Sequence, residues 1–266
     1  MKASFPVSPR GAASDRREAF TVIELLVIIG IVAVLAMIQV SALAGAQGRT
    51  KMTMCSGNVR QLTVAQHLYT GDNKDKLPVL TGSAAWAWDL PWDVGSRLLS
   101  YNLQERTFYC PGTAPRFTDW DNFLNPAAFA TLWNFSPPNI HVTGYVFAYS
   151  GSTSLITVSN QNTTILAEPV KVSSLPSVPA LPPPPNSERM LIADATLCSQ
   201  VGGSYALRYT YNYTAIPGGF VKPHTSPHLR GQFPEGGNVG FKDGHVAWRK
   251  FDDMSPRTVS GPTFWW

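Results

Sequence analysis

The chain has 266 residues and a mass of 29.0 kDa, enough for one large domain or two small ones with a hydrophobic core. Hydrophobic residues make up 44% and charged residues only 14%, which excludes a charge-rich disordered chain. The net charge of +4 is small and scattered along the sequence, so we expect no nucleic-acid partner.

The first 40 residues divide into a polar leader and an apolar run. Residues 1–19 carry Lys and Arg side chains, and residues 20–38 form an apolar run with one charge, Glu24. A helix of that run is about 28 Å long, close to the hydrocarbon thickness of a bilayer. Because the basic residues precede the run, the positive-inside rule predicts a cytoplasmic leader, a membrane-spanning stem at 20–40 and an extracytoplasmic domain at 41–266.

Glu24 is the residue that distinguishes this run from an ordinary membrane segment. A carboxylate within lipid is costly and marks a functional site by default, unless it lies at the level of the headgroups. The order of the residues Ala19–Leu26, AFTVIELL, resembles the type IV prepilin signal of type IV pilins and type II secretion pseudopilins. Ala19 stands where that family usually has Gly.

The resemblance implies how the N-terminus is processed and used. A prepilin peptidase cuts between Ala19 and Phe20, and the new amino terminus of Phe20 is methylated. Glu24, the fifth residue of the mature chain, then neutralises the buried amino terminus of a neighbouring subunit, since a buried charge requires a partner. The family's location is the inner membrane, and its partners are the peptidase and related pilin subunits.

Two other export signals are compatible with parts of the same sequence. An ordinary secretory signal has an apolar region at about 25–38 and a cleavage site at Ala42–Ala44. A twin-arginine signal uses Arg16 and Arg17. Neither accounts for Glu24 or for the residues around it.

A long helix is predicted from about residue 20 to residue 70. Proline is absent from this stretch, and its second half has the three- and four-residue spacing of an amphipathic helix at Val59, Leu62, Ala65, Gln66 and Tyr69. The segment 71–78, GDNKDKLP, ends it.

Three further segments extend the resemblance. Residues 55–69, 72–78 and 108–112 are similar to those of pseudopilin-like proteins from planctomycete- and verrucomicrobium-type bacteria. These proteins combine a prepilin N-terminus with a C-terminal motif of His, nine residues and Asp-Gly.

The rest of the chain favours short strands and loops. A Pro-rich exposed loop is expected at 176–186, and a C-terminal hairpin at 238–251 with a type I′ turn at Asp243-Gly244. Other β-branched or aromatic runs bounded by turn residues predict strands. These runs are 145–149, 155–158, 163–167, 190–193 and 207–213.

Together these observations predict an α+β fold of the pilin type. Its long N-terminal helix spans the membrane with its apolar half, and its second half packs on an antiparallel β-sheet with loop-rich insertions.

The C-terminal motif is present with its histidine displaced. Asp243 and Gly244 match the Asp-Gly of the family, but the family His falls on Phe233, and the nearest upstream histidine is His228. One interpretation is a contact or ligand site formed by His228 and Asp243. The other is that Asp243 only makes a turn and His228 only anchors a loop. His224 and His228 are four residues apart, but neighbouring prolines argue against a helical metal-binding pair.

Three cysteines are available for pairing: Cys55, Cys110 and Cys198. Disulfides persist outside the cytoplasm, and Cys55–Cys110 is the predicted pair, although sequence leaves the connectivity open. Paired ligands at zinc-site spacing are lacking, so no metal site is predicted. Calcium is the one alternative, because some related pseudopilins bind it near the C-terminus; its candidate ligands here are Asp243, Asp252 and Asp253.

We therefore expect a structural pilin-like subunit without enzymatic activity or cofactor, assembled through its N-terminal helix into a type II secretion or type IV pilus-like fibre. The alternative is a membrane-tethered or secreted binding module for carbohydrate that uses only the export signal. Its motivation is a tryptophan-rich segment of the kind that stacks on sugars, which comprises Trp86, Trp88, Asp89, Trp92 and Asp93.

Overall fold

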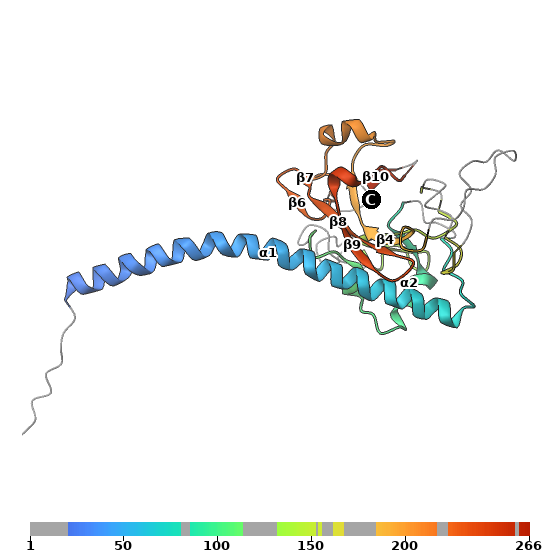
Figure 1. The fold of residues 1–266 in the computed structure, drawn as a ribbon, viewed down its shortest axis with the longest axis horizontal. Helices are drawn as coiled ribbons and strands as arrows, with labels where there is room; N and C mark the ends of the chain where they lie inside the picture. The colour runs from blue at the N-terminus through green and yellow to red at the C-terminus, as the bar shows by residue number, and fades with distance from the viewer. Residues whose placement is uncertain are drawn as a thin grey trace, which may run out of the picture. The chain divides into compact units, whose positions relative to one another are not determined.

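A computed structural model describes most of the chain, and for residues 38–45 it describes the backbone only (Figure 1). The described residues are 21–80, 86–113, 132–152, 154–155, 162–167, 185–216, 223–258 and 261–266. The predicted cleavage site at Ala19 and Phe20, most of the predicted strand 155–158 and residues 176–184 of the predicted Pro-rich loop lie outside these ranges.

The described elements are short apart from one helix. The helices are α1 (Val22–Asp72), α2 (Trp92–Leu99) and the 3-10 helices η1 (Glu105–Phe108), η2 (Tyr205–Thr210) and η3 (Phe251–Asp253). The strands are β1 (Asp89–Pro91), β2 (Ile140–Val142), β3 (Tyr145–Phe147), β4 (Met190–Asp194), β5 (Thr196–Cys198), β6 (Leu229–Arg230), β7 (Phe233–Pro234), β8 (Gly236–Phe241), β9 (Val246–Lys250) and β10 (Thr263–Trp265).

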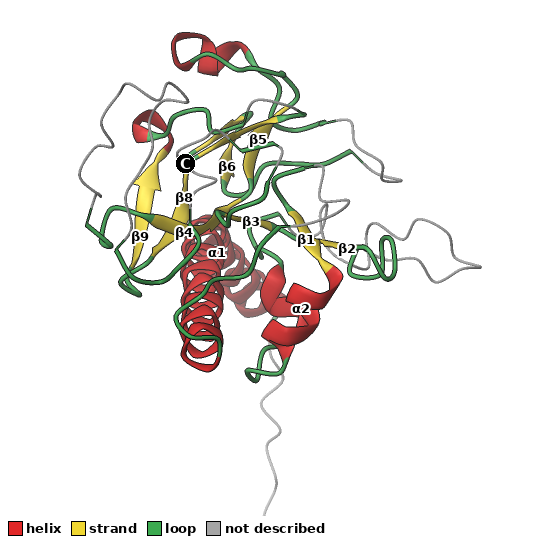
Figure 2. Cartoon of the chain, turned by 90° about the vertical axis from the view of Figure 1, so that its right-hand side faces the viewer, coloured by secondary structure: helices red, strands yellow, loops and turns green. Residues whose placement is uncertain are grey.

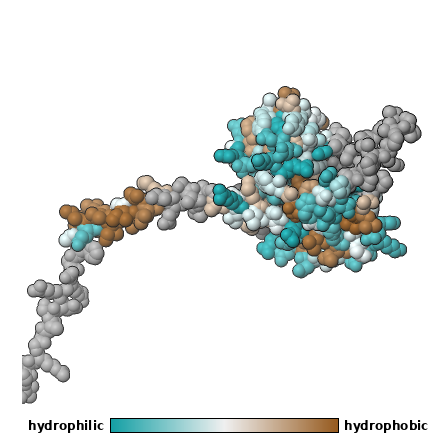
Figure 3. All heavy atoms as spheres, in the orientation of Figure 1, coloured by the Kyte–Doolittle hydropathy of each residue, from teal (hydrophilic) through white to brown (hydrophobic). Residues whose placement is uncertain are grey.

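The chain forms two compact units, Met1–Ala46 and Gln47–Trp266, and α1 runs from the first into the second. Between Val22 and Met37, in the first unit, the helix exposes large apolar side chains, drawn in brown in Figure 3. These are Val22, Ile23, Leu25, Leu26, Val27, Ile28, Ile29, Ile31, Val32, Val34, Leu35 and Met37. Within the parts of the chain that the structure describes, no helix is long and apolar enough to cross a membrane.

The end of α1 follows from its last residues. The backbone N–H of Asp75 donates to the carbonyl of Thr70 at 2.8 Å, and Lys74 and Asp75 both adopt positive φ angles of 57° and 61°. Left-handed residues cannot continue a right-handed helix. The prediction of a helix from about 20 to 70, ended by the polar turn, is therefore confirmed.

In the second unit α1 contributes one buried side to the hydrophobic core. Val59 and Leu62 are fully buried, and they belong to the same core cluster as Ile192 of β4 and Val239 of β8. Gly240 of β8 allows this approach, because a Cβ atom there would lie 3.1 Å from a methyl carbon of Val59. The predicted amphipathic spacing is confirmed by this buried side.

The main sheet has four antiparallel strands in the order β3-β4-β8-β9, and Figure 2 shows them with the shorter ladders. Its register aligns Val146, Ala193, Val239 and Ala247 across the four strands. The other strands form three separate two-stranded ladders, β1 with β2, β5 with β10, and β6 with β7. The predicted strands at 145–149 and 190–193 are confirmed as β3 and β4.

The strand predicted at 207–213 is wrong, because this segment contains most of η2. Leu207 and Tyr209 are exposed, whereas Arg208 is buried and its guanidinium donates to the carbonyls of Phe251 and Met254. The alternating pattern of residues 207–213 therefore does not come from a pleated strand. It comes from a 3-10 helix in which Arg208 points inward and its neighbours point outward.

The strand predicted at 163–167 is also wrong. Thr164 makes only an isolated bridge with Lys76, and its hydroxyl donates to the carbonyl of Asp75 at 2.8 Å. The segment serves as a tie to the end of α1.

The C-terminal hairpin is confirmed as β8 and β9, but its turn differs from the predicted type I′. The N–H of Gly244 donates to the carbonyl of Phe241 at 3.0 Å, and Gly244 has φ +94°. Asp243 does not have the positive φ that a type I′ turn requires. The connection is the longer kind of loop, in which a glycine in the left-handed region follows a turn.

The predicted fold class, an α+β pilin fold with a membrane-spanning apolar half-helix on one antiparallel sheet, is corrected. The membrane-spanning helix is not found among the described residues, and the strands are divided between one four-stranded sheet and three small ladders. The chain is a mixed α/β protein. The division into ladders arises because most strands are two to five residues long and end at turns and irregular segments.

Candidate functional site

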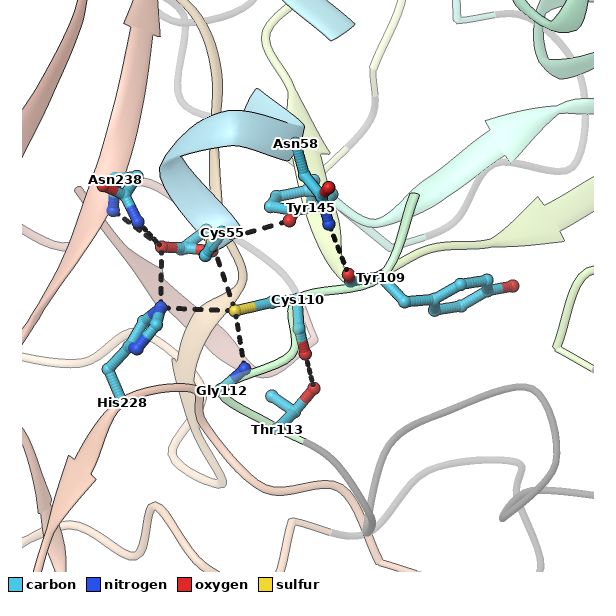
Figure 4. Close-up of polar contacts among 10 residues, drawn as sticks. Cys55, Asn58, Tyr109, Cys110, Gly112, Thr113, Tyr145, His228 and Asn238 are labelled. Atoms are coloured by element: carbon cyan, nitrogen blue, oxygen red, sulfur yellow. Dashed lines mark hydrogen bonds and ion pairs between the residues drawn. The ribbon is translucent and has the colours of Figure 1, made fainter. Parts of the chain in front are cut away.

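Four buried polar side chains meet inside the second unit (Figure 4). Cys55 comes from α1, Cys110 from the segment after η1, Asp194 from the end of β4 and His228 from the residue before β6. Their exposed fractions are 0%, 0%, 1% and 6%. We call this group the Cys–Asp–His cluster.

The potential ligand atoms of the cluster all lie within 4.8 Å of one another. The Sγ of Cys110 lies 3.2 Å from the Sγ of Cys55 and 3.2 Å from Nε2 of His228. Asp194 completes the group, with Oδ1 2.9 Å from the Sγ of Cys55 and Oδ2 3.4 Å from Nε2 of His228. Each member therefore contacts two others.

Asp194 is held by the neighbouring strand of the sheet. Its Oδ2 accepts hydrogen bonds from the backbone N–H of Asn238 at 2.6 Å and from the side-chain amide of Asn238 at 3.2 Å. On its other side Asp194 pairs in register with Tyr145 of β3, whose hydroxyl lies 3.5 Å from the Sγ of Cys55. Because β4 lies between β3 and β8, both neighbouring strands help to hold the Asp194 carboxylate against Cys55 of α1.

Cys110 and His228 are fixed by the same short loop. The N–H of Gly112 donates to the Sγ of Cys110 at 3.3 Å, and the hydroxyl of Thr113 donates to the carbonyl of Cys110 at 2.7 Å. A Cβ on Gly112 would lie 2.7 Å from the His228 ring, so glycine is needed for this approach. His228 itself has φ +52°, an uncommon conformation for a non-glycine residue.

Burial and hydrogen bonding act in opposite directions on the charges of the cluster. Burial lowers the pKa of His228, but the hydrogen bonds and charge interactions with Asp194 and Cys55 together outweigh it and raise that pKa to about 10. Burial raises the pKa of Asp194, but the hydrogen bond and charge of His228, together with hydrogen bonds from Cys55 and Asn238, outweigh it and leave the pKa below its usual value. Burial raises the pKa of the Cys110 thiol well above its usual value. In this protonation state the cluster contains a buried ion pair beside a neutral thiol.

The structure brings the predicted disulfide partners Cys55 and Cys110 together, but as free thiols. Cys198, the predicted leftover cysteine, is also buried and free, and it lies in β5 within the smaller core cluster. Cys55 and Cys110 therefore lie next to each other, as a disulfide requires, and the disulfide itself stays a prediction.

The two residues of the C-terminal motif belong to separate groups. Asp243 is exposed and its Oδ1 lies 2.6 Å from Nδ1 of His245, whereas His228 contacts Cys110 and Asp194. Asp243 and Gly244 serve the hairpin turn, as one of the two interpretations of the motif predicted. His228 does more than anchor a loop, because it joins the Cys–Asp–His cluster.

The predicted calcium ligands are not gathered into a site. Asp243 lies in the hairpin turn, whereas Asp252 and Asp253 lie in η3. All three side chains are exposed. In the described ranges, the Cys–Asp–His cluster is the only group of three or more His, Cys, Asp or Glu residues placed to hold a metal ion.

The tryptophans proposed for sugar stacking are largely packed in the core. Trp88 is 1% exposed, stacks on Trp86 at 5.3 Å and meets the edge of Phe264 at 5.2 Å. Trp92 stacks on His141 at 4.2 Å. These rings do not form an open platform for a sugar.

Glu24 has a local role at the start of α1. Its Oε2 accepts hydrogen bonds from the N–H and the hydroxyl of Thr21, both at 2.8 Å, and its own N–H donates to the Thr21 hydroxyl oxygen at 3.3 Å. This is a capping box, in which the residue before the helix and the third helical residue satisfy each other's donors.

Sequence reasoning missed the cluster because its members come from distant segments. Cys55 and Asp194 are 139 residues apart, and Cys110 and His228 are 118 apart. Metal motifs are recognised by close spacing of paired ligands, which this chain lacks. The only local signal for Asp194 was its place at the end of the apolar run MLIAD.

Comparison of the chain with models of protein families, with curated proteins and with solved structures finds no match.

Proposed function

We propose that the chain is a structural, pseudopilin-like subunit that assembles through its N-terminal helix into a type II secretion or type IV pilus-like fibre. The observation that carries this proposal is the exposed apolar surface of α1 between Val22 and Met37. The resemblance of Ala19–Leu26 to the prepilin signal supports it independently.

The exposure is too extensive for a helix that functions alone in water. Side chains such as Ile23, Leu26 and Val34 are 74%, 62% and 59% exposed, and the exposed apolar residues between Val22 and Met37, taken together, lie on all sides of the helix. A helix that is hydrophobic all round is normally buried, and contiguous exposed apolar surface marks an interaction site. Like helices from other subunits supply a matching apolar surface, so a bundle of such helices buries it.

Glu24 gives this bundle its register in the proposal. The capping box holds its carboxylate at the first turn of α1, where it remains exposed. After cleavage between Ala19 and Phe20, each subunit begins with a positive amino group that loses water within an apolar bundle. The carboxylate of a neighbour neutralises that charge, because an unpaired charge is costly to bury.

The variants Glu24→Ala and Glu24→Gln separate the two roles of this residue. Gln serves in a capping box as Glu does, but it has no charge. If the charge neutralises a neighbouring amino terminus, both variants lose fibre assembly when co-expressed with a prepilin peptidase and a pilus-assembly system, while both are still cleaved. The measurement is the amount of sheared fibre relative to the cleaved subunit.

Glu24→Asp is the control, because it retains the charge and is expected to retain partial assembly. Normal assembly of Glu24→Gln would show that Glu24 only caps α1, and would remove the electrostatic part of the proposal.

Processing is tested separately by mass spectrometry of the mature protein. We expect a chain that begins at N-methylated Phe20. A chain beginning at residue 45 instead would identify an ordinary secretory signal and would contradict assembly through α1.

The partners and the location belong to the same proposal. The partners are a prepilin peptidase and related pilin subunits, and the location is the inner membrane with the leader 1–19 in the cytoplasm. The support is the order of the basic leader and the apolar run in the sequence. In this role the protein is structural and not catalytic.

One observation favours the alternative of a binding module. A surface pocket of about 480 Å³ is lined by aromatic side chains that include Tyr209, Phe233 and Trp248, together with Arg230 and Glu235. Tyr209 is 51% and Trp248 is 37% exposed, so both rings are available to a ligand such as a carbohydrate. Glycan-array binding that is lost in Trp248→Ala, by a protein that forms no fibre, would favour this function over the first.

A further inference from the structure

We propose that the Cys–Asp–His cluster binds one Zn²⁺ ion as a structural site, through Cys55 Sγ, Cys110 Sγ, one carboxylate oxygen of Asp194 and His228 Nε2. This inference goes beyond the proposed function and does not depend on it.

The four residues bring their potential ligand atoms as close together as the ligands of one metal ion are, all within 4.8 Å of one another. For zinc bonds of about 2.0–2.3 Å, the edges of the ligand tetrahedron are roughly 3.3–3.8 Å long. Four contacts in the cluster are 2.9, 3.2, 3.2 and 3.4 Å, and Asp194 makes two of them through different carboxylate oxygens, Oδ1 to Cys55 and Oδ2 to His228. These contacts are close to or shorter than such edges, so the proposed site requires the ligand atoms to separate slightly around the ion and one carboxylate oxygen of Asp194 to turn toward it.

The chemistry of the donors favours zinc over the other common ions. Thiolate and imidazole together are ligands of zinc, whereas calcium and magnesium take oxygen ligands. Asp194 supplies the fourth ligand and, with two thiolates, makes the site anionic enough to offset the charge of the ion. Buried charges in proteins are generally paired or coordinate metals.

Burial of all four residues indicates a structural and not a catalytic role. Catalytic zinc has three protein ligands and an open position for water or substrate, whereas structural zinc has four protein ligands. With exposed fractions of 0–6%, the cluster is closed to solvent.

The residues around the cluster orient the ligands as the surroundings of metal sites do. Asn238 donates two hydrogen bonds to the Asp194 carboxylate, and Gly112 donates its N–H to the Sγ of Cys110. Such outer contacts fix ligand orientation and affect metal affinity. The left-handed backbone of His228 is local strain of the kind that persists at functional sites, where the surrounding structure holds it.

A Cys55–Cys110 disulfide is the competing explanation for the two thiols. It requires the sulfur atoms to move from 3.2 Å to about 2.05 Å, a larger change than zinc binding requires. It also leaves unexplained why Asp194 and His228 converge on the same two sulfurs. A metal ion accounts for all four residues at once.

The test uses the full-length chain, purified in detergent under reducing conditions and dialysed against zinc. We expect one zinc per chain by elemental mass spectrometry, and a thiolate-to-metal charge-transfer absorption when cobalt replaces zinc. Cys55→Ser and Cys110→Ser are expected to weaken zinc binding by at least about 100-fold. Cys198→Ser is the matched control, since Cys198 is equally buried but lies outside the cluster, and it should bind as the wild type does.

A second measurement guards against variants that only misfold. A zinc chelator should lower the melting temperature of the wild type and of Cys198→Ser, but leave that of Cys55→Ser unchanged. Reduced wild-type protein that takes up no zinc, cobalt binding without thiolate absorption, or equal loss of zinc in Cys198→Ser would each overturn the proposal.

Discussion

His224 is a histidine that the fold keeps neutral. It is fully buried, and its ring lies 4.3 Å from the ring of Trp88. Burial lowers its pKa to about 3, because the charged form loses its hydration. Proline residues on both sides of His224 argue against a helical metal pair with His228, and the structure places the two histidines in different surroundings.

The buried state of His224 makes stability depend on pH. In the unfolded chain its pKa is about 6.5, so between pH 6.5 and 3 the unfolded state binds more protons than the folded state. The contribution to stability is complete above pH 6.5 and is lost as the pH falls toward 3. Comparing pH 7 with pH 4.5, we expect wild type to lose about 2–3 kcal/mol more than His224→Phe does, measured by urea unfolding. Equal losses in the two proteins would contradict the burial argument.

The residues of the candidate site were only partly predictable. Cys55 and Cys110 could be paired because few cysteines were available, and His228 was singled out by its motif. Asp194 could not be identified from the sequence. An aspartate at the end of a strand is equally typical of a turn and of a ligand, and only the folded sheet shows that it contacts Cys55 of α1.

Gly57 and Gly240 differ in how much space surrounds them, so replacing each with alanine should change stability in opposite directions. Gly57 lies in α1, where an added Cβ would meet nothing within 4 Å. Because glycine weakens a helix through its backbone entropy, Gly57→Ala should raise the free energy of unfolding by about 0.5–1 kcal/mol. Chemical denaturation of the full chain measures this; a decrease would mean that the helix needs the glycine there.

Gly240 lies in β8, at the place where α1 approaches the sheet. An added Cβ would lie 2.4 Å from the hydroxyl oxygen of Thr63 and 2.8 Å from a methyl carbon of Ile192. Gly240→Ala should therefore destabilise the protein by about 1–3 kcal/mol through overpacking. If Thr63→Ala, which removes the hydroxyl oxygen, relieves much of that loss in the double variant, the crowding is at Thr63; a tolerated Gly240→Ala would contradict the close approach.

At the level of elements, the sequence was informative where one local pattern determines the structure. The spacing of α1 and the residues of β3, β4, β8 and β9 were of this kind. The segment 207–213 was not, because Arg208 is drawn inward by carbonyls of Phe251 and Met254, far away in the sequence. The position of the hairpin turn was predicted correctly, but its type was not. Asp-Gly occurs both in two-residue type I′ turns and in longer loops that end with a left-handed glycine.

The second unit contains every residue of both core clusters, so it should fold without the first. We expect residues 47–266 to unfold in one cooperative transition, with a melting temperature close to that of the full chain in detergent, and to remain monomeric without detergent. Differential scanning calorimetry and analytical centrifugation test this. A fragment that fails to fold would show that residues 1–46 contribute to the core.

For the whole molecule, the fold class was the least predictable feature. Short strands with many turn residues are compatible with several sheet arrangements, and only long-range pairing decides among them. Instead of the expected single sheet, the described strands form a four-stranded sheet and separate two-stranded ladders. One of these ladders pairs β5 with the C-terminal strand β10.

The long separations within the Cys–Asp–His cluster also have a consequence for biosynthesis. Ribosomes add about 5–20 residues per second, so Asp194 is made roughly 7–28 s after Cys55, which it contacts 139 residues away. Both cysteines are complete well before the carboxylate and the imidazole exist. If the emerging chain enters an oxidising compartment in that order, its thiols meet oxidants before their other partners arrive. Maturation then becomes a competition between oxidation and metal capture, decided by the order in which the chain is made.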